Sequence, residues 1–381
     1  MGKIDDLIKE LCPDGVKYVK LGEVSDIKRG IRVIKKDLSV SGLYPVFQNS
    51  LIPLGYYDKT NCSANTTFII MAGAAGEIGY TDKPVWAADD CFYIDSKENL
   101  HNKYIYYFLL KRQHYLKSKV RKASIPRLSR EFVEKLQIPL PPLSIQQQIV
   151  EILDNFTDSI SNLQEELELR EKQMEYYREK LFDFNEDEYE WKYIPEVASY
   201  STGLTYKPTN ISDSGILVLR SSNIKDNTLS YDDNVFVQMG IPNRSKIHKN
   251  DILICVRNGS KKLVGKCAYI SELKYECAFG AFMNILRAHS IDSKFLYYSW
   301  LLNSTINQYK GDDAAPICQI TNKDFNRIKI PVPSLTRQQE IVDILDTFES
   351  MITNIKEEIE LRQKQYEYYR EKLLTFERKE A

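Results

Sequence analysis

Residues 136–184 read LQIPLPPLSIQQQIVEILDNFTDSISNLQEELELREKQMEYYREKLFDF, and residues 328–376 read IKIPVPSLTRQQEIVDILDTFESMITNIKEEIELRQKQYEYYREKLLTF. The two segments align without a gap, and 29 of 49 positions are identical. A repeat of this length at an interval of 192 residues indicates that a whole module was duplicated, not a short solenoid unit. Two copies in one chain predict approximate two-fold symmetry, which suits the binding of a bipartite partner.

Each copy of the repeat predicts a short extended segment followed by one long helix. The prolines of IPLPP (138–142) and IPVP (330–333) exclude a helix there, because proline lacks an amide donor and restricts the residue before it. Ser144 and Thr336 follow where N-caps are expected. Gln147, like its counterpart in the second copy, comes three residues later, as in a capping box.

A seven-residue apolar repeat continues along both predicted helices. This spacing predicts a narrow stripe that packs against another helix as a coiled coil, and the natural partner of each copy is the other copy. Arg170 and Arg362 occupy the same position of the stripe, where a polar residue either fixes the register or extends its charged end into water; the sequence does not choose between the two. The expected helix-pair seam contains Leu153, Phe156, Ile160, Leu163, Leu167, Arg170 and Met174 from the first helix, and Leu345, Phe348, Ile352, Ile355, Ile359, Arg362 and Tyr366 from the second.

Composition limits the class of protein. A length of 381 residues allows two or three domains, and 43% hydrophobic with 28% charged residues is ordinary for a soluble globular protein. No apolar run approaches the ~20 residues of a membrane helix, and the start, MGKIDDLIKE, does not resemble a signal peptide. Seven cysteines without a CxxC pair and only four histidines disfavour a structural zinc site and predict buried, reduced thiols in a cytosolic protein.

Charge is divided unevenly along the chain. Residues 1–137 carry 22 Lys+Arg and 16 Asp+Glu, and residues 185–329 carry 18 and 16. The repeat segments are acidic, with 4 and 10 in residues 138–184 and 8 and 11 in residues 330–381. If the protein binds a polyanion, the segments outside the repeats are therefore expected to bind it. The alternative is that long exposed helices are simply rich in glutamate.

The segments outside the repeats are also related to each other, although more distantly. EVSDIKRG (23–30) aligns with EVASYSTG (196–203), and YPVFQNS (44–50) resembles ILVLRSS (216–222). These pieces are short runs with β propensity, bounded by Gly, Asn and Ser turns.

The two segments also share a third predicted strand and a helix near their ends. TFII (67–70) resembles DILI (251–254), and each segment becomes helical later, at residues 103–120 and 294–309. The glycines that follow the third strand keep a six-residue spacing in both copies: Gly73 and Gly79, Gly259 and Gly265. Each segment is therefore interpreted as a compact α+β domain, mostly β with a helix near its end.

These patterns predict the domain organisation. The domains are residues 1–137 and 185–329, and the repeat helices are residues 138–184 and 330–381; the acidic NEDEYE stretch after the first repeat marks a boundary. The second helix has no domain after it, whereas the N-terminal residues supply the missing continuation. The chain therefore reads as a circle cut once, with its termini meeting beside the end of the second helix.

Catalytic motifs are hard to find in this sequence. GAAGEIG (73–79) lacks the GK[ST] ending of a phosphate-binding loop and the context of a dinucleotide fingerprint, so hairpin packing is the better interpretation. No HExxH or GxSxG motif occurs, and the [DN]PP[YF] signature of amino-methyltransferases is absent. A binding module is favoured over an enzyme.

The doubled P-x-x-x-QQ-x-IV-x-ILD pattern, each copy preceding a long helix that ends in YYREKL, resembles the specificity subunits of type I restriction–modification systems. The opening ELCPDGVKYVKLGEV fits the same family, and the resemblance covers essentially the whole chain. It implies an α+β fold with two mostly-β target recognition domains, separated by two long antiparallel helices that form a coiled coil with pseudo-two-fold (circular) symmetry.

The resemblance also implies a function and partners. Each target recognition domain would read one half of a bipartite double-stranded DNA target, while the helices set the spacing and dock two methyltransferase subunits. Restriction/translocase subunits would join through the methyltransferase core. The chain itself would be non-catalytic and hold no cofactor, and S-adenosylmethionine, ATP and Mg would be used by the partner subunits of this cytoplasmic complex in a bacterium or archaeon.

Candidate DNA contacts are polar and basic clusters in the two domains. Arg pairs with guanine and Asn or Gln with adenine, whereas Lys, Arg and Ser also bind phosphates. In the first domain the candidates are Lys28, Arg29, Arg32, Lys35, Lys36, Gln48, Asn49, Ser50, Lys119, Arg121, Lys122, Ser124 and Arg127. In the second they are Ser201, Thr202, Lys207, Arg220, Ser221, Ser222, Asn223, Arg257, Asn258, Ser260, Lys261 and Lys262. Any single one could instead be a solvated surface group. The rival function is a coiled-coil scaffolding adaptor whose globular domains bind proteins.

Overall fold

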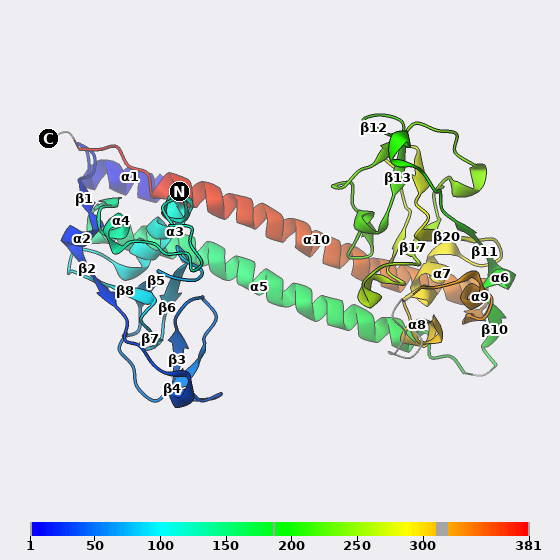
Figure 1. Ribbon diagram of the computed structural model, residues 1–381, viewed down its shortest axis with the longest axis horizontal. Helices are drawn as coiled ribbons and strands as arrows, with labels where there is room; N and C mark the ends of the chain where they lie inside the picture. Colours follow the sequence, from blue (N-terminus) through cyan, green and yellow to red (C-terminus); the bar gives the residue numbers. More distant parts are fainter. Residues whose placement is uncertain (1, 186, 310–318, 380–381) are drawn as a thin grey trace. The chain divides into compact units, whose positions relative to one another are not determined.

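The computed structural model describes residues 2–185, 187–309 and 319–379. It divides into two compact units, one comprising Met1–Glu165 with Lys356–Ala381 and the other Glu166–Ile355 (Figure 1). No helix among the described residues combines the length and apolar character needed to cross a membrane.

The first unit contains two sheets and a strand pair. Its four-stranded antiparallel sheet has the order β2-β8-β5-β6, its three-stranded sheet the order β4-β3-β7, and β1 pairs with β9. Only β3 and β7 in this unit run parallel among the described strands. The elements are α1 (Gly2–Leu11), β1 (Tyr18–Lys20), α2 (Leu21–Val24), β2 (Ser25–Arg29), β3 (Tyr44–Phe47), β4 (Gly55–Tyr57), β5 (Thr66–Ile70), β6 (Ile78–Thr81), β7 (Trp86–Ala87), β8 (Cys91–Ser96), α3 (Asn102–Ser118), α4 (Arg130–Glu134) and β9 (Gln137–Pro139).

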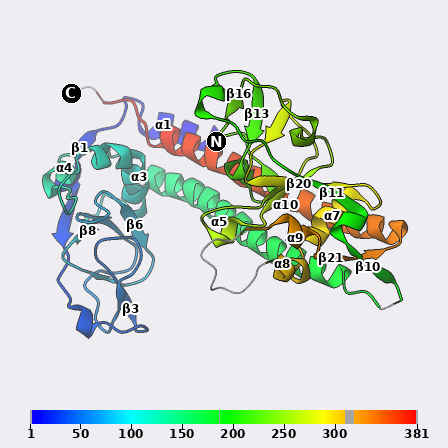
Figure 2. The ribbon, with the colours of Figure 1, turned by 45° about the vertical axis from the view of Figure 1, so that its right-hand side comes forward.

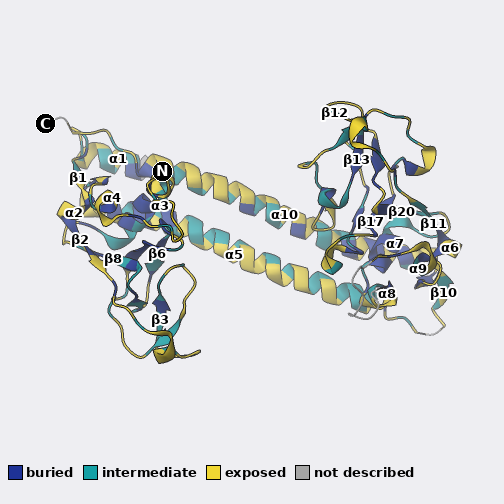
Figure 3. Ribbon diagram, in the orientation of Figure 1, coloured by how far each residue is buried: buried dark blue, intermediate teal, exposed yellow. Residues whose placement is uncertain are grey.

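The four-stranded sheet of the first unit is buried on both faces. Alternation along β5 sends Ile69 toward α3 and the long helices, and Phe68 and Ile70 toward the three-stranded sheet. Figure 3 shows this interior in the colour of buried residues. The first domain is therefore a sheet held between a helical layer and a small outer sheet.

The second unit repeats this plan. Its sheets have the orders β11-β20-β17-β18 and β12-β16-β13-β19, with the pairs β10-β21 and β14-β15 beside them. The elements are β10 (Tyr189–Tyr193), α6 (Ile194–Val197), β11 (Ala198–Thr202), β12 (Ile211–Ser212), β13 (Ile216–Leu219), β14 (Ile224–Lys225), β15 (Thr228–Leu229), β16 (Phe236–Val237), β17 (Ile252–Cys255), β18 (Cys267–Tyr269), β19 (Cys277–Phe279), β20 (Met283–Ala288), α7 (Ser293–Trp300), α8 (Asn303–Tyr309), α9 (Asn322–Phe325) and β21 (Lys329–Pro333). In Figure 2, β10 and β21 lie side by side, as their register requires.

The two long helices, α5 (Leu143–Leu181) and α10 (Leu335–Leu373), have 39 residues each and contribute to both units. In the first unit Phe156 stacks on Tyr369 with ring centroids 5.3 Å apart, and in the second Tyr177 stacks on Phe348 at 5.4 Å. Each contact joins the early part of one helix to the late part of the other. The helices therefore pair antiparallel within each unit, and the same aromatic contact occurs twice.

The two domains share a backbone framework beyond the strands that the sequence matched. Gly30 N donates to Cys91 O at 2.9 Å, and Gly203 N donates to Met283 O at 3.2 Å. Asn65 and Asn250 both have positive φ, 57° and 70°. The predicted equivalence of residues 23–30 with 196–203 is confirmed, because they form β2 and β11. Residues 44–50 and 216–222 are likewise equivalent and contain β3 and β13.

The third strand match is wrong by one residue. Ile70 pairs with Cys91 and Cys255 pairs with Met283, so TFII corresponds to ILIC instead of DILI. The glycine alignment is also wrong. Gly76 N donates to Ile70 O and Gly265 N to Cys255 O, both at 2.8 Å with φ near +90°, so Gly76 is the counterpart of Gly265. The equal six-residue spacing is a coincidence, because the second domain has a longer hairpin.

The helix starts also need correction. α5 and α10 begin at Leu143 and Leu335, so Ser144 and Thr336 lie inside the first turn, and the Ser334 Oγ accepts the Arg337 amide at 3.4 Å. Gln147 donates to Glu151 instead of closing a capping box.

The helix expected at residues 294–309 is two helices, whereas the helix expected at residues 103–120 is confirmed as α3. The break lies between α7 and α8. It allows Tyr309 to stack on the buried Trp300 at 5.1 Å, and Trp300 Nε1 donates to Gly265 O at 3.0 Å. A continuous helix would carry Tyr309 away from this stack.

The two ends of the chain meet within the first unit, as the circular pattern predicted. Val16 N donates to Glu377 O at 2.8 Å, Lys379 N donates to Val16 O at 3.0 Å, and Tyr18 Oη donates to Phe376 O at 3.0 Å.

The cysteines that the structure describes are free thiols. They are buried except for the half-buried Cys12, and Cys318 lies outside the described residues. Burial raises the pKa of the Cys62 and Cys277 thiols to about 11. Within residues 2–185, 187–309 and 319–379, no group of three or more His, Cys, Asp or Glu side chains could hold a metal ion.

Candidate nucleic-acid interface

Each domain is joined to a long helix by the first glutamine of its QQ motif. Gln146 is fully buried, and its Nε2 donates to Pro141 O at 2.8 Å while its Oε1 accepts the His101 amide at 2.8 Å. Gln338 does the same with Pro333 O and the Asp292 amide, both at 2.9 Å. His101 and Asp292 are the N-caps of α3 and α7, so one side chain joins the starts of two helices.

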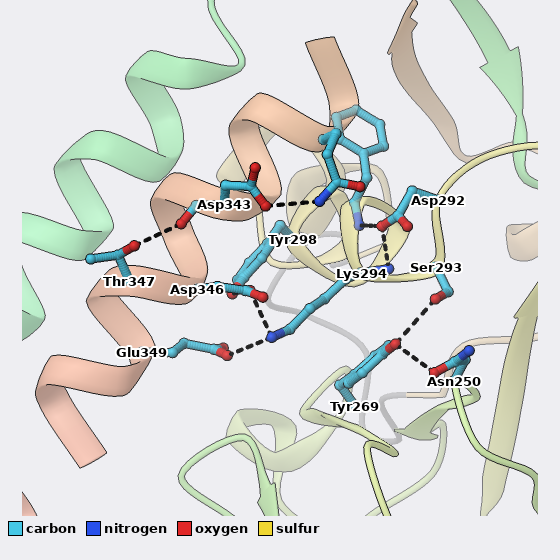
Figure 4. Close-up of polar contacts among 12 residues, drawn as sticks. Asn250, Tyr269, Asp292, Ser293, Lys294, Tyr298, Asp343, Asp346, Thr347 and Glu349 are labelled. Carbon is cyan, nitrogen blue, oxygen red and sulfur yellow. Dashed lines mark hydrogen bonds and ion pairs between the residues drawn. The ribbon is translucent and has the colours of Figure 1, made fainter. Parts of the chain in front are cut away.

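The aspartate of each ILD motif forms a second junction. In the first unit Asp154 accepts Tyr107 Oη at 2.5 Å and pairs with Lys103 Nζ at 2.9 Å. Figure 4 shows the second unit, where Lys294 extends from α7 toward two carboxylates of α10.

In the second unit the contact made by the ILD aspartate includes one more carboxylate. Asp346 accepts Tyr298 Oη at 2.7 Å and pairs with Lys294 Nζ at 2.6 Å, and Glu349 lies 3.6 Å from the same nitrogen. Burial raises the pKa of Glu349, although the Lys294 charge opposes the shift. These contacts join each domain to its long helix.

In the first domain the structure brings two predicted clusters together around Gly73. The Ala74 amide donates to Asn49 O at 2.9 Å, and the Gly73 amide donates to Pro126 O at 3.1 Å. Gly73 has a φ of +84°, and a Cβ there would lie 2.8 Å from the Asn49 side chain. The turn therefore packs the hairpin loop that follows β3 against the basic loop at residues 121–127.

The basic loop is closed at its base. Arg121 N donates to Arg127 O at 2.8 Å, and Arg127 N donates back to Arg121 O at 3.2 Å. Lys122 and Ser124 are exposed between these ends, and Lys119 lies over the Tyr115 ring at 5.3 Å. The loop therefore presents its charges on a defined backbone next to Asn49.

Other candidates of the first domain have internal partners. Lys28 pairs with Asp95 at 2.5 Å, the Arg29 Nε donates to Asp89 O at 2.9 Å, and Gln48 donates to the Asp89 carboxylate at 3.4 Å. Ser50 Oγ donates to Ile52 O at 3.0 Å.

Three remaining candidates of this domain lie together after β2. The side chains that are exposed there without an ion pair among the described residues are Arg32, Lys35 and Lys36.

The corresponding place in the second domain also joins two predicted clusters. Asn258 Nδ2 donates to Ser221 Oγ at 3.2 Å, and Asn258 Oδ1 accepts the Ser260 amide at 3.0 Å. Arg257 is exposed, and its guanidinium lies 5.3 Å from the centre of the Phe282 ring.

Arg220 is held in place by an acidic partner. Its Nη2 lies 2.8 Å from Asp233 Oδ2 and donates to Asp233 O at 3.2 Å, and its Nε is buried without a hydrogen-bond partner among the described residues. Hydrogen bonding by Ser222 and the charge of Arg220 lower the pKa of Asp233. Asn223 is fully buried and donates to Ser230 O and Asp233 O at 3.1 Å. Asn223 therefore supports the turn instead of facing a ligand.

The other candidates of the second domain are spread more widely. Ser201 Oγ donates to Arg244 O at 2.8 Å. The remaining candidates are exposed except for the half-buried Lys261, and they are Thr202, Lys207, Ser260, Lys261 and Lys262.

A pocket of about 620 Å³ lies at this surface, and its walls include residues that the sequence analysis missed. Tyr206 and Phe282 line it together with Arg220, Ser221 and Ser222. Phe282 is 57% exposed in the turn that precedes β20. An aromatic residue in a turn was the available signal, but only the fold places it beside the basic residues.

The structurally equivalent surfaces carry different side chains. Gly280 N donates to Leu219 O at 2.9 Å, and Ala88 N donates to Phe47 O at 2.8 Å, so Arg220 is the counterpart of Gln48. Likewise, the amides of Met71 and Val256 donate to the carbonyls of Asp90 and Phe282, so Asp90 is the counterpart of Phe282 and Ala72 of Arg257. The framework is the same in both domains, whereas the presented chemistry differs.

All predicted seam residues are buried or half-buried. Arg170 bonds to Gln173 at 3.1 Å and Glu166 at 3.4 Å, and Arg362 bonds to Glu358 at 2.7 Å, so both arginines bond along their own helices. The buried seam residues are Leu153, Leu345, Ile352 and Ile359, and the half-buried ones are Phe156, Ile160, Leu163, Leu167, Arg170, Met174, Phe348, Ile355, Arg362 and Tyr366.

Comparison with known proteins agrees with this repeated architecture. The model of the type I restriction modification DNA specificity domain matches twice, at residues 13–170 and 186–361. The chain belongs to this family. Each match covers one domain and much of the long helix that follows it.

Named relatives belong to the same family. The chain is 33% identical over 297 residues to the specificity subunit of the type I restriction enzyme EcoR124I/EcoR124II of Escherichia coli, covering 73% of this chain and 72% of that protein. It is 28% identical over 405 residues to a putative type I restriction enzyme specificity subunit of Haemophilus influenzae, covering 95% of this chain and 96% of the relative.

The fold also matches a solved structure. The S subunit of a type I restriction–modification system from M. genitalium superposes with a TM-score of 0.65 at 20% identity, covering 94% of this chain and 96% of that one. The α+β specificity-subunit fold, with two domains and antiparallel helices, is therefore the fold of this chain.

Proposed function

We propose that the chain is the DNA specificity subunit of a type I restriction–modification complex. Residues 1–137 and 185–329 act as target recognition domains, and each reads one half of a bipartite double-stranded DNA target. The helices at 138–184 and 330–381 set the distance between the half-sites. The chain selects the site and performs no catalysis itself.

The observation that carries this proposal is the contrast between framework and surface. Both domains keep the same hydrogen bonds at Gly30 and Gly203, yet they present Gln48 in one and Arg220 in the other at equivalent positions. Two similar frameworks with different polar surfaces suit the reading of two different sequences, because base choice depends on the side chains offered to a groove.

We propose that the candidate clusters of both domains contact the DNA. Asn223 is the exception, because it supports the turn. In the first domain the closed 121–127 loop and the neighbouring Asn49 form one surface. Lysine and arginine in such a loop suit phosphate contacts, which position a protein on the duplex without reading sequence.

The junctions shared by both units support docking of two copies of one partner. The contacts of Gln146 and Asp154 recur at Gln338 and Asp346, so the start of each long helix is built in the same way and a partner that docks on one unit fits the other. We assign this role to two methyltransferase subunits, which carry S-adenosylmethionine. Restriction/translocase subunits that use ATP and Mg join through them, and the complex acts in the cytoplasm.

Methylome sequencing of a host that expresses the chain with its methyltransferase subunits tests the function. We expect one split motif whose halves both carry methylated adenine. Exchange of residues 185–329 for those of a relative should change one half of the motif and leave the other intact. A change in both halves, or methylation without a defined motif, would contradict one domain per half-site. Salt-dependent duplex binding by the assembled complex separates DNA recognition from protein scaffolding.

A further inference from the structure

We infer that Arg257 of the second domain reads a guanine, with Phe282 holding its guanidinium in the reading orientation. The inference rests on the proposed DNA-recognition function and assigns one residue of the second domain to one base of the half-site that this domain reads. It follows from the partners that each polar side chain of this surface has within the protein.

Most of the neighbouring polar groups already have internal partners. Arg220 is paired with Asp233, and both ends of the Asn258 amide are bonded, to Ser221 and to the Ser260 backbone. Asn223 is buried. These groups hold internal partners that shape the surface, so fewer of their donors and acceptors remain for a base.

Arg257 differs from these neighbours. Among the described residues its guanidinium has no hydrogen-bond or ion-pair partner, and its side chain contacts the face of the Phe282 ring at 5.3 Å. Within the described part of the chain, all five N–H donors are therefore without a partner. Stacking on an aromatic ring restricts the guanidinium plane without consuming a donor, so less conformational entropy is lost on binding.

Phe282 is itself fixed by the backbone. Its carbonyl accepts the amides of Val256 at 3.0 Å and Arg257 at 3.2 Å, so the backbone of the turn that carries the ring is held beside the backbone of the arginine. Phe282 is 57% exposed and forms a wall of the pocket that also contains Tyr206 and Ser221.

The chemistry favours a base edge over a phosphate. Guanine presents O6 and N7 side by side in the major groove, and a planar guanidinium matches both acceptors at once. A phosphate contact requires only a cation, and the exposed Lys262 nearby serves that purpose without an aromatic support.

The first domain has no arginine–phenylalanine pair at the equivalent positions. The positions equivalent to Arg257 and Phe282 hold Ala72 and Asp90, so neither the guanidinium nor the ring is present. The guanine contact therefore belongs to the half-site of the second domain.

The test uses the full-length chain assembled with its methyltransferase subunits, and a duplex that carries the motif found by methylome sequencing. Each guanine of the second half-site is replaced in turn by 7-deazaguanine, which lacks the N7 acceptor. For the wild type we expect one replacement to weaken binding about 5- to 150-fold. The Arg257→Met variant, whose side chain has no hydrogen-bond donor, should bind the natural duplex more weakly and should no longer respond to that replacement.

Phe282→Leu, which keeps an apolar side chain but removes the ring, should reduce the discrimination partially. Lys262→Gln is the matched control, because it removes one charge from the same segment. It should weaken binding to all sequences alike and leave the response to 7-deazaguanine unchanged, with a salt dependence lower by about one ion.

The outcomes separate the two levels of the hypothesis. If the wild-type complex recognises a split motif but Arg257→Met weakens binding equally for every sequence, Arg257 contacts phosphate and the guanine assignment is wrong, while the proposed function stands. A second half-site without guanine has the same meaning. If the wild-type complex recognises no defined motif, the proposed function fails and the assignment fails with it.

Discussion

The Gln146 side chain accepts a hydrogen bond from the backbone amide of His101 at 2.8 Å, and this contact joins the start of α5 to the N-cap of α3. The same carboxamide donates to Pro141 O and to Asn99 O at 3.0 Å, so all of its bonds lie inside the first unit. The QQ motif that identified the repeat therefore serves a structural junction. Gln338 makes the corresponding contact with Asp292 in the second unit.

Removal of this side chain should destabilise the first unit. We expect Gln146→Ala to lower the free energy of unfolding by about 2–4 kcal/mol, because the half-buried amide of His101 and the carbonyls of Asn99 and Pro141 lose their buried partner. Chemical denaturation measures the change. Gln147→Ala is the control, since Gln147 is exposed and its side chain donates to the exposed Glu151, and it should change stability by less than about 0.5 kcal/mol. Equal effects of the two substitutions would refute the junction.

The stability of the α5–α10 helix pair should depend on the apolar residues buried between the two helices. Ile359→Asp places a charge at a position that is 8% exposed, and an unpaired charge there is expected to cost several kcal/mol. The melting temperature and the affinity for the methyltransferase subunits should both fall. Leu361→Asp is the matched control, because Leu361 is 54% exposed on the same turn. Wild-type stability of the Ile359 variant would show that the seam is assigned incorrectly.

A pH-dependent effect is expected at Glu349. Burial raises its folded-state pKa, so the fold favours the neutral acid. The resulting stability is present below the ordinary glutamate pKa and is lost as the pH rises through the raised value.

Glu349→Gln keeps a neutral amide at that position, and Lys294 keeps its ion pair with Asp346 at 2.6 Å. The variant should therefore melt higher than the wild type at pH 7, and about 2–4 °C would correspond to ~1 kcal/mol. The difference should disappear near pH 4. Glu360→Gln, an exposed position of the same helix, should show no such trend. A variant that melts lower at pH 7 would indicate that the Lys294 contact outweighs burial.

The sequence predicted the long helices well because a heptad pattern over five turns and more has few alternative structures. It could not predict what the QQ and ILD residues contact, because their partners, such as Asn99 and Tyr298, are about 47 residues away along the chain. Composition likewise placed Asn223 among the surface candidates, whereas the turn after β13 buries it. Clusters of basic residues were visible in the sequence, but the stacking of Arg257 on Phe282 depends on the fold.

The length of α5 and α10 is expected to set the distance between the two half-sites. The two units divide at Glu165 in α5 and at Lys356 in α10, so four residues inserted after Glu165 and four before Lys356 would leave each unit intact. Four residues lengthen a helix by ~6 Å, close to two base-pair rises, and rotate the residues beyond the insertion by ~40°, against ~34° of DNA twist per base pair. We therefore expect the spacer between the half-sites to change by one or two base pairs while both half-sequences stay the same.

Methylome sequencing of the double-insertion variant measures the spacer directly. Insertion into α5 alone is the informative control, since it shifts the aromatic contact of Phe156 with Tyr369 out of register with that of Tyr177 with Phe348 and should reduce methylation at every spacer. An unchanged spacer at full activity in the double variant would show that the distance between half-sites is set elsewhere in the complex, because the proposed function requires the added length and rotation of the helices to reach the DNA.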